Sequence, residues 1–356
     1  MSGTYLVPPY LIPTGLLTGK SAARAVAAGI AAPLAGGPIA FSAAELVTRM
    51  ADGSGLRQSV SLPQVPADLL QTFTAPRRSW AGFDLKRPLI MGIVNVTPDS
   101  FSDGGDFADA DSAIARGVAL AKAGADILDI GGESTRPGSA PVPADEEVRR
   151  VIPVVRALAE RGLCVSVDTR HAIVMAEAVA AGARIINDVT ALTGDSESEQ
   201  VAARSGAAIV LMHMLGEPQT MQANPVYADA TLDLLDYFAA RLERLATLGV
   251  DRARISLDPG IGFGKKDPHN LLILNELAAF HGLGCPLTLG VSRKSFIGRL
   301  SRGEAPKERL AGSVTLAALG LGQGVQIMRV HDVPETFQAR AMMAALEIVS
   351  SGDGLI

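Results

Sequence analysis

An alternation of apolar runs and helical patterns fills the chain from Leu89 almost to its end. Each apolar run is short, rich in β-branched residues and free of polar alternation, which is typical of a parallel strand covered on both faces. Each run ends in polar residues and is followed by helical periodicity, often closed by a glycine. The chain is therefore restricted to α/β folds. The predicted strands are 89–95, 125–131, 163–168, 183–189, 207–213, 254–258, 286–292 and 326–331.

The number of these units decides between two α/β architectures. Eight strands and eight helices within residues 81–356 agree with the about 250 residues of a closed (βα)8 TIM barrel. An open, doubly wound sheet is the alternative, but no glycine fingerprint of the dinucleotide-binding type follows the first strand. We therefore predict an α/β fold, with a (βα)8 TIM barrel as the catalytic domain in residues 81–356.

Residues 1–80 have a different character, because prolines and glycines interrupt their apolar runs and charges are sparse. A helix is predicted at 20–31, and another at 42–51, where Ser42 and Glu45 have the spacing of a capping box. Residues 79–87 are predicted to form a short hairpin into the first barrel strand. No catalytic constellation is visible here. We expect an N-terminal extension of unknown role, without which the barrel keeps its chemistry.

Composition and charge exclude several classes of protein. A net charge of −5 argues against nucleic acid as the main partner. No stretch approaches the about 20 uninterrupted apolar residues of a membrane span. Cys164 and Cys285 lie in or beside apolar strand patterns, which fits a reducing compartment and no disulfide or metal site. We expect a cytoplasmic protein, and apolar positions on the last helices allow a homodimer.

Polar residues at the strand ends predict a ligand pocket, because TIM-barrel enzymes keep their sites at the carboxyl ends of the strands. Asp168, Asn187 and Asp258 end the third, fourth and sixth strands and would point into one pocket. Buried carboxylates beside an amide suit the N–H-rich edge of a flat heterocycle of the guanine or pterin type. Each residue alone also fits a helix N-cap, but that explanation is poor for all three together.

The last two strands end in groups that bind anions. Ser292 and Lys294 follow the seventh strand, and Arg329 and His331 end the eighth. The loops after strands 7 and 8 of barrels often bind phosphate, so we predict an anion site. Asn95 ends the first strand and offers a neutral oxygen that, with phosphate oxygens and water, is a usual way to hold Mg²⁺.

Three loops complete the predicted mouth. The loops after the first two strands, 96–106 and 133–138, are polar and contain glycine, which is typical of lids that close over a reactive intermediate. The glycines of residues 259–264 let the backbone approach a ligand, and Phe263 is placed to lie against a ring.

Eight motifs at these strand ends resemble those of dihydropteroate synthase, the folate-pathway family that sulfonamides inhibit. The resemblance runs from Leu89 to about Ile348 and says nothing about the extension. The motifs are GIVNVTPDSFSDGG (92–105), DIGGESTRPG (129–138), SVDT (166–169), IINDV (185–189), LMHM (211–214), LDPGIGFGK (257–265), GVSRKSFIG (290–298) and RVHDV (329–333).

The resemblance implies a reaction, a cofactor and a set of roles. (7,8-Dihydropterin-6-yl)methyl diphosphate would condense with p-aminobenzoate to give 7,8-dihydropteroate and pyrophosphate, with Mg²⁺ as cofactor. The bond to pyrophosphate would break first. The implied pterin-binding residues are Asp168, Asn187, Asp258 and Lys294, with Val189, Met212 and Phe263 lining the pocket. The implied anion pocket is Asn95, which holds Mg²⁺, with Arg136, Arg329 and His331, and the implied p-aminobenzoate residues are Thr135, Pro137 and Ser292.

Two other functions share part of this pattern. A barrel of the methyltetrahydrofolate–corrinoid methyltransferase type would read pterin with similar residues, but it would not need the ESTRPG, SRKS and RVH residues. A degenerate paralogue that only binds pterin would have lost Asn95, Arg136, Lys294 or Arg329, and the sequence keeps all four. A second enzyme domain is excluded from the first 80 residues by their length. The synthase interpretation explains the whole set.

Overall fold

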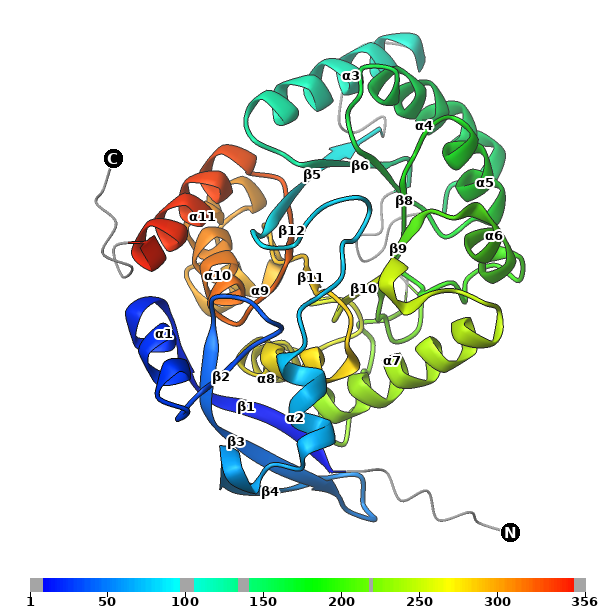
Figure 1. The fold of residues 1–356 in the computed structure, drawn as a ribbon. Coiled ribbons are helices and arrows are strands. Elements are labelled where there is room, and N and C mark those ends of the chain that lie inside the picture. The colour runs from blue at the N-terminus through cyan, green and yellow to red at the C-terminus, as the bar shows by residue number, and fades with distance from the viewer. Residues whose placement is uncertain (1–8, 97–105, 134–140, 218–219, 349–356) are drawn as a thin grey trace.

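The computed structural model describes residues 9–96, 106–133, 141–217 and 220–348 (Figure 1). For residues 106–109 and 347–348 it describes the backbone alone. Thr135, Arg136 and Pro137, to which the sequence assigns roles, lie outside the described residues, as does most of the acidic loop after the first barrel strand.

Eight parallel strands form one sheet in the order β10-β9-β8-β7-β6-β5-β12-β11. The two ends of this order meet at a parallel bridge between Leu257 and Leu287, and beside it the buried hydroxyls of Ser256 and Thr288 lie 2.7 Å apart. The predicted TIM barrel is therefore confirmed, and each strand falls inside its predicted range. The strands are β5 (Leu89–Asn95), β6 (Ile127–Gly131), β7 (Val165–Asp168), β8 (Ile185–Asp188), β9 (Ala208–Met212), β10 (Ile255–Asp258), β11 (Thr288–Leu289) and β12 (Ile327–Val330).

Helices surround the barrel because each has one apolar side that packs on the strands (Figure 1). In α4 (Ala144–Ala159), for example, Val151, Val154, Val155 and Leu158 are fully buried. No helix in the described part of the chain has the length and apolar character to cross a membrane. The helices are α3 (Asp106–Lys122), α4 (Ala144–Ala159), α5 (Ala172–Ala180), α6 (Ser198–Ser205), α7 (Ala230–Thr247), α8 (Asp267–Asn275), α9 (Ser295–Leu300), α10 (Leu310–Gly322) and α11 (Val333–Ile348), with 3-10 turns η1 (Leu62–Gln64), η3 (Arg252–Arg254), η4 (Leu277–Leu283) and η5 (Pro306–Glu308).

Trp80 closes the end of the barrel where the strands begin. Its side chain is fully buried, and its indole Nε1 donates a hydrogen bond to the carbonyl of Arg254 at 3.0 Å. A tight antiparallel bridge between Trp80 and Phe83 forms the predicted hairpin. The side chains that share one core cluster with Trp80 are those of Leu89, Met91, Ile127, Cys164, Ile185, Ala208, Val210 and Ile327.

The N-terminal extension forms an antiparallel sheet with two helices. The central strand β3 (Ala40–Arg49) pairs with β1 (Tyr10–Leu17) on one side and with β2 (Ala32–Pro33) and β4 (Gly55–Ser61) on the other. The helices are α1 (Gly19–Ala27), which agrees with the helix predicted at 20–31, and α2 (Ala67–Thr74).

The helix predicted at 42–51 is wrong, because this segment is strand β3. The capping-box residues have other partners: the Ser42 hydroxyl donates to the carbonyl of Gly15 in β1, and Glu45 faces Arg57 in β4. Pairing along both edges of β3 satisfies its backbone groups, and this tertiary pairing overrides the local capping signal.

The sheet of the extension packs on the outer layer of the barrel next to η4 (Figure 1). Leu11, Phe41 and Phe73 form one apolar cluster with Ala278 of η4. Ile12 and Val47 belong to the apolar cluster of the barrel itself. The extension is thus in continuous apolar contact with the barrel.

Replacing Trp80 by alanine is expected to lower the free energy of unfolding by about 3–5 kcal/mol, because it opens a cavity in the barrel base. Trp80→Phe keeps an aromatic ring in the base but loses one hydrogen bond. We expect it to lower the free energy of unfolding by about 1 kcal/mol for the hydrogen bond, plus a small loss of packing. Urea unfolding followed by circular dichroism measures both. Equal midpoints for the wild type and Trp80→Ala would show that Trp80 does not support the base.

Candidate active site

The carboxyl ends of the strands hold the polar side chains that the sequence singled out. Asp168 ends β7, Asn187 lies in β8 and Asp258 ends β10, and all three are buried. Met212, at the end of β9, and Val189, directly after β8, are buried apolar neighbours. Parallel strands of a closed barrel bring their carboxyl ends to one rim, so these residues surround one mouth.

Arg329 in β12 links three strands across this mouth. Its Nε donates to Oδ2 of Asp129 at 2.7 Å, and its Nη2 donates to Oδ2 of Asp168 at 2.5 Å. The Nδ2 of Asn187 donates to the same oxygen of Asp129 at 3.0 Å. One guanidinium, two carboxylates and one amide therefore form a connected network at the centre of the site.

Asp129 is a site residue that the sequence reasoning missed. It lies inside β6 rather than at its end, and its side chain is fully buried. A single carboxylate within an otherwise apolar strand was the available signal, because a buried charge needs a partner. Only the fold shows that the partner is Arg329.

The charges of the network are set by burial and by each other. Burial disfavours the charge of Arg329, but Asp129 and Asp168 outweigh it and hold the pKa of Arg329 above its ordinary value. Burial raises the pKa of Asp168 to about 7, against the opposing pull of Arg329. Burial also raises the pKa of Asp258, although the N–H of Gly260 donates to its Oδ1 at 2.7 Å. The mouth thus contains one carboxyl group, that of Asp168, with a pKa near neutral pH, and a second, that of Asp258, with a raised pKa.

Lys294 and Phe263 form a cation–π pair at the edge of the pocket. The Nζ of Lys294 lies 4.1 Å from the centre of the Phe263 ring. Burial lowers the pKa of Lys294 to about 8, while Asp258 opposes the shift. Gly262, the residue before Phe263, has a φ of 83°, and a Cβ at this position would be 3.4 Å from Cδ of Lys294. The glycine therefore lets the loop come close to the lysine.

Ser292 and His331 join the last two strand ends. The Oγ of Ser292 accepts from the backbone N–H of His331 at 3.1 Å and lies 3.1 Å from Nδ1 of its ring. Beside them, Arg293 has a left-handed φ of 58° and forms an ion pair with Asp332. This pair holds together the loops that follow β11 and β12.

Asn95 and Asp168 lie on either side of Gly131. A Cβ built on Gly131 would be 3.9 Å from Oδ1 of Asn95 and 3.6 Å from Oδ2 of Asp168. An amide oxygen is a hard, neutral donor of the kind that Mg²⁺ accepts. Within the described residues, no cluster of three or more His, Cys, Asp and Glu side chains could hold a metal.

Glu133 and Arg170 lie at the base of the loop after β6. Arg170 donates to both carboxylate oxygens of Glu133, at 2.9 and 3.0 Å, and the backbone N–H of Val142 donates to Glu133 at 3.0 Å. One carboxylate therefore links Glu133 with Val142 and with Arg170. Thr135, Arg136 and Pro137 belong to the segment 134–140 and lie outside the described residues.

Lys265 is a second residue that the sequence reasoning missed. Its side chain is fully buried, and its Nζ lies 2.9 Å from Nδ1 of His213 and within 3.2 Å of the carbonyls of Gly260, Phe263 and His213. Burial lowers the pKa of Lys265 well below its ordinary value, and burial with Lys265 nearby lowers the pKa of His213 to about 2. Lys265 therefore stiffens the loop that carries Phe263.

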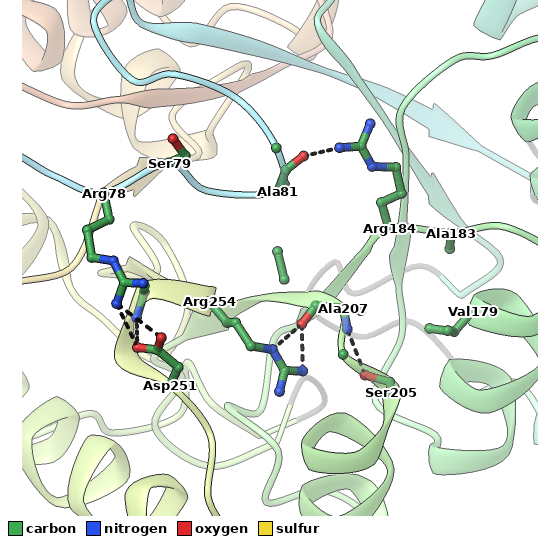
Figure 2. A pocket seen from close by; sticks show the side chains of 14 residues that line it. Arg78, Ser79, Ala81, Val179, Ala183, Arg184, Ser205, Ala207, Asp251 and Arg254 are labelled. Carbon is green, nitrogen blue, oxygen red and sulfur yellow. Dashed lines mark hydrogen bonds and ion pairs between the residues drawn. The ribbon is translucent and has the colours of Figure 1, made fainter.

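A hollow of about 480 Å³ lies at the opposite end of the barrel (Figure 2). Arg254 donates there to the carbonyls of residues 202, 203 and 207 at the end of α6. Arg184 donates to the carbonyl of Ala81, and Arg78 pairs with Asp251. These three arginines are therefore paired with backbone carbonyls and with Asp251, and we assign them a structural role at this hollow.

Comparison with known proteins decides the family. A family profile described as "Pterin binding enzyme" matches residues 91–331. Dihydropteroate synthase of Escherichia coli (strain K12) is 46% identical over 263 residues, which are 74% of this chain and 93% of the relative. The chain belongs to the dihydropteroate synthase family.

Solved structures of dihydropteroate synthases share the fold. The Yersinia pestis enzyme with a sulfonamide drug is 45% identical, with a TM-score of 0.70, covering 74% of this chain and 95% of that one. The Xanthomonas albilineans enzyme with 4-aminobenzoic acid is 44% identical with a TM-score of 0.71, covering 75% and 96%. In complex with 7,8-dihydropteroate it is 42% identical with a TM-score of 0.68, covering 74% and 95%. The family resemblance drawn from the eight motifs is thus confirmed.

The two shifted pKa values predict a narrow pH optimum of kcat/KM. Below pH about 7, Asp168 takes up a proton and no longer accepts from a substrate N–H, so kcat/KM should fall. Above pH about 8, Lys294 loses its charge, and kcat/KM should fall again.

Two variants separate these limbs. Lys294→Arg should move the alkaline limb upward, because a guanidinium stays charged, and Asp168→Asn should remove most of the acid limb from the residual activity. Unchanged profiles in both variants would exclude these two groups from the titration.

Proposed function

We propose that this chain condenses (7,8-dihydropterin-6-yl)methyl diphosphate with p-aminobenzoate, giving 7,8-dihydropteroate and pyrophosphate in folate biosynthesis. One observation carries the assignment of the site: Arg329 binds both Asp129 and Asp168 in the mouth of a barrel that belongs to the dihydropteroate synthase family. Carboxylates suited to a pterin edge and cations suited to a diphosphate meet at this point.

The pterin is assigned to the buried acidic side of the mouth. Asp168 and Asp258 are acceptors for ring N–H groups, and Asn187 both donates and accepts. Lys294 and Phe263, which contact each other, are proposed to lie beside the ring, since a cation and an aromatic face stabilise a flat heterocycle. Val189 and Met212 supply the apolar lining.

The diphosphate is assigned to the cationic side. Arg329 and His331 face the rim at the end of β12, and Arg136 joins them by its motif. Cations at this position stabilise the charge that develops on the leaving pyrophosphate. Arg329 already neutralises two carboxylates, so it is charged and oriented before the substrate arrives.

Mg²⁺ is proposed as the cofactor, held by Asn95 together with diphosphate oxygens and water. When bound, it supplies Lewis-acid neutralisation of the leaving group. The fit rests on the amide oxygen of Asn95, which lies with the carboxylate of Asp168 around Gly131 at the mouth. Ser292, Thr135 and Pro137 are proposed to bind p-aminobenzoate.

The alternative functions lack a specific observation in their favour. A pterin-binding paralogue without activity would be expected to lack site groups, yet Asn95, Lys294 and Arg329 are present at the mouth. A corrinoid-dependent methyltransferase would not need the cations after β11 and β12.

We also propose that the chain acts as a cytoplasmic homodimer, without nucleic acid or membrane as partner. Exposed apolar side chains of α10 and α11 support a self-contact: Leu319, Phe337, Met342 and Leu346. The two cysteines are buried free thiols, which fits a reducing compartment.

Purified protein should release pyrophosphate from the pterin diphosphate only when p-aminobenzoate is present, yield 7,8-dihydropteroate and be blocked by a sulfonamide. Lys294→Ala should lower kcat/KM by about 100-fold or more, because it removes a cation from the pocket. Pterin binding without any pyrophosphate release would instead support the inactive paralogue or the methyltransferase.

Asn95→Ala should raise the Mg²⁺ concentration for half-maximal rate by about tenfold, because it removes the proposed protein ligand of the metal. Asn275→Ala, at the exposed end of α8, is the matched control and should behave as wild type. Titration of the rate with Mg²⁺ after treatment with a chelator measures both. Identical curves for the two variants would remove Asn95 from the metal site.

A further inference from the structure

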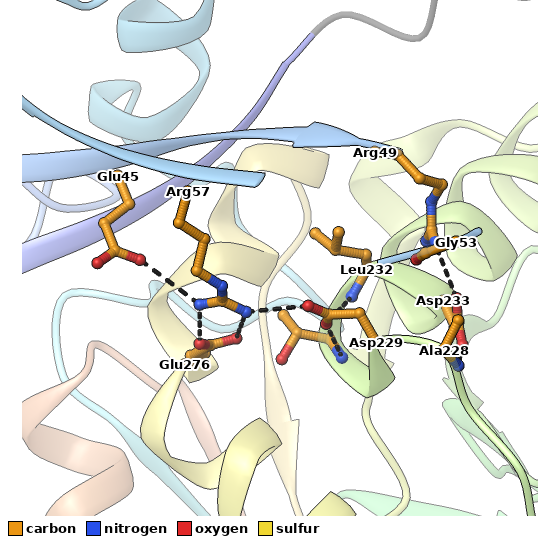
Figure 3. Close-up of polar contacts among 10 residues, drawn as sticks. Glu45, Arg49, Gly53, Arg57, Ala228, Asp229, Leu232, Asp233 and Glu276 are labelled. Carbon is orange, nitrogen blue, oxygen red and sulfur yellow. Dashed lines mark hydrogen bonds and ion pairs between the residues drawn. The ribbon is translucent and has the colours of Figure 1, made fainter. Parts of the chain in front are cut away.

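The N-terminal extension holds the barrel through a cluster of charged contacts at the start of α7 (Figure 3). Arg57 of β4 pairs with Asp229 at 3.0 Å and with Glu276, and it also faces Glu45 of its own sheet. Asp229 and Glu276 are only 10% and 6% exposed at the side chain. Two nearly buried carboxylates of the barrel thus share a guanidinium that the extension supplies.

A second arginine of the extension, Arg49, also pairs with α7. We call the ion pairs of Arg57 and Arg49 with the barrel the clamp. Arg49 of β3 pairs with Asp233 and Asp236, each at 2.8 Å. The other carboxylate oxygen of Asp233 accepts from the backbone N–H of Ala228 at 3.0 Å. The clamp therefore reaches the backbone that leads into α7.

The turn between β3 and β4 lies directly against the same backbone. A Cβ on Gly53, which has φ of 84°, would come within 2.7 Å of the Cβ of Ala228. A Cβ on Gly55 would lie 3.0 Å from Leu232 and 3.3 Å from Asp229. Glycine is favoured at position 53 because its φ lies in the left-handed region and a Cβ would collide with the side chain of Ala228.

Residues 220–229, the arm, lead into α7, and the clamp contacts their end at Ala228 and Asp229. Two of its side chains bind the backbone of residues 259–265, the glycine loop. Tyr227 donates from its hydroxyl to the carbonyl of Gly264, and Gln222 donates from Nε2 to the carbonyl of Gly262, each at 2.7 Å. The arm thus supports the loop that places Phe263 beside Lys294.

We infer that the N-terminal extension is a brace for the pterin pocket, in which Arg57 acts as a positioning residue through Asp229, the arm and the glycine loop. The inference rests on the proposed function, because it assigns pterin to Phe263 and Lys294. The match to the Escherichia coli relative covers 93% of that protein, which leaves too little chain there for an extension of this length. The brace is therefore a feature that this chain adds relative to that enzyme. By this inference the extension contributes to the site, whereas the sequence alone led us to expect a barrel that keeps its chemistry without it.

The test compares Arg57→Gln with Arg78→Gln, a matched control whose exposed ion pair with Asp251 lies at the other end of the barrel. Arg57→Gln should raise KM for the pterin diphosphate about tenfold and leave kcat and the KM for p-aminobenzoate within about twofold, since it removes positioning and no reacting group. Arg57→Lys should restore part of the loss. Arg78→Gln should match wild type.

Coupling through the arm is tested with Tyr227→Phe. This variant should reproduce the rise in KM, and the double variant with Arg57→Gln should be no worse than either single one, because both act on one contact path. Additive effects of the two substitutions, or an unchanged KM in a folded Arg57→Gln protein, would overturn the inference.

Amide hydrogen exchange gives a readout that does not depend on turnover. In Arg57→Gln, exchange should accelerate in the arm, residues 220–229, and in the glycine loop, residues 259–265, and stay unchanged in α4 and α5. If Arg57→Gln does not fold, Asp229→Asn replaces it with the same expectations. A wild-type protein without synthase activity would refute the proposed function alone, whereas unchanged exchange in both segments would refute the brace.

Discussion

The site depends on one buried guanidinium that two carboxylates share. Arg329 would be costly to bury alone, and so would Asp129 and Asp168, because each loses its hydration. The closed barrel brings β6, β7 and β12 to the distances at which these costs offset one another. The network is therefore formed before any ligand binds, and a reacting diphosphate meets a charge that needs little reorganisation. Changes elsewhere in the barrel act on the site to the extent that they alter this geometry.

The two ends of the barrel have different roles: the end where the strands begin supports stability, and the end where they finish carries the site. The end where the strands begin is filled by Trp80 and by arginines that bind backbone carbonyls, so its polar groups are satisfied internally. The other end leaves carboxylates with raised pKa values and a lysine with a lowered one. Groups with pKa values shifted toward neutrality that surround one mouth are typical of a catalytic site.

Much of the fold was predictable from the sequence, because each barrel strand is a covered apolar run and each run ends in polar residues. The same pattern located Asp168, Asn187, Asp258 and the groups after β11 and β12. Asp129 escaped it because it lies inside a strand, and the roles of Lys265 and Arg57 depend on partners far along the chain. Strand β3 was mistaken for a helix because a capping box is a local signal and sheet pairing is not.

The position of Trp80 gives the protein a spectroscopic property. It is the single tryptophan of the chain, and its indole is fully buried at the base with its N–H bonded to a carbonyl. Its fluorescence emission therefore reports on the packing of the barrel base, where Trp80 is buried against the first residues of the barrel strands. Unfolding would expose the indole to water and shift its emission to longer wavelength, so intrinsic fluorescence reports on loss of structure at the base of the barrel.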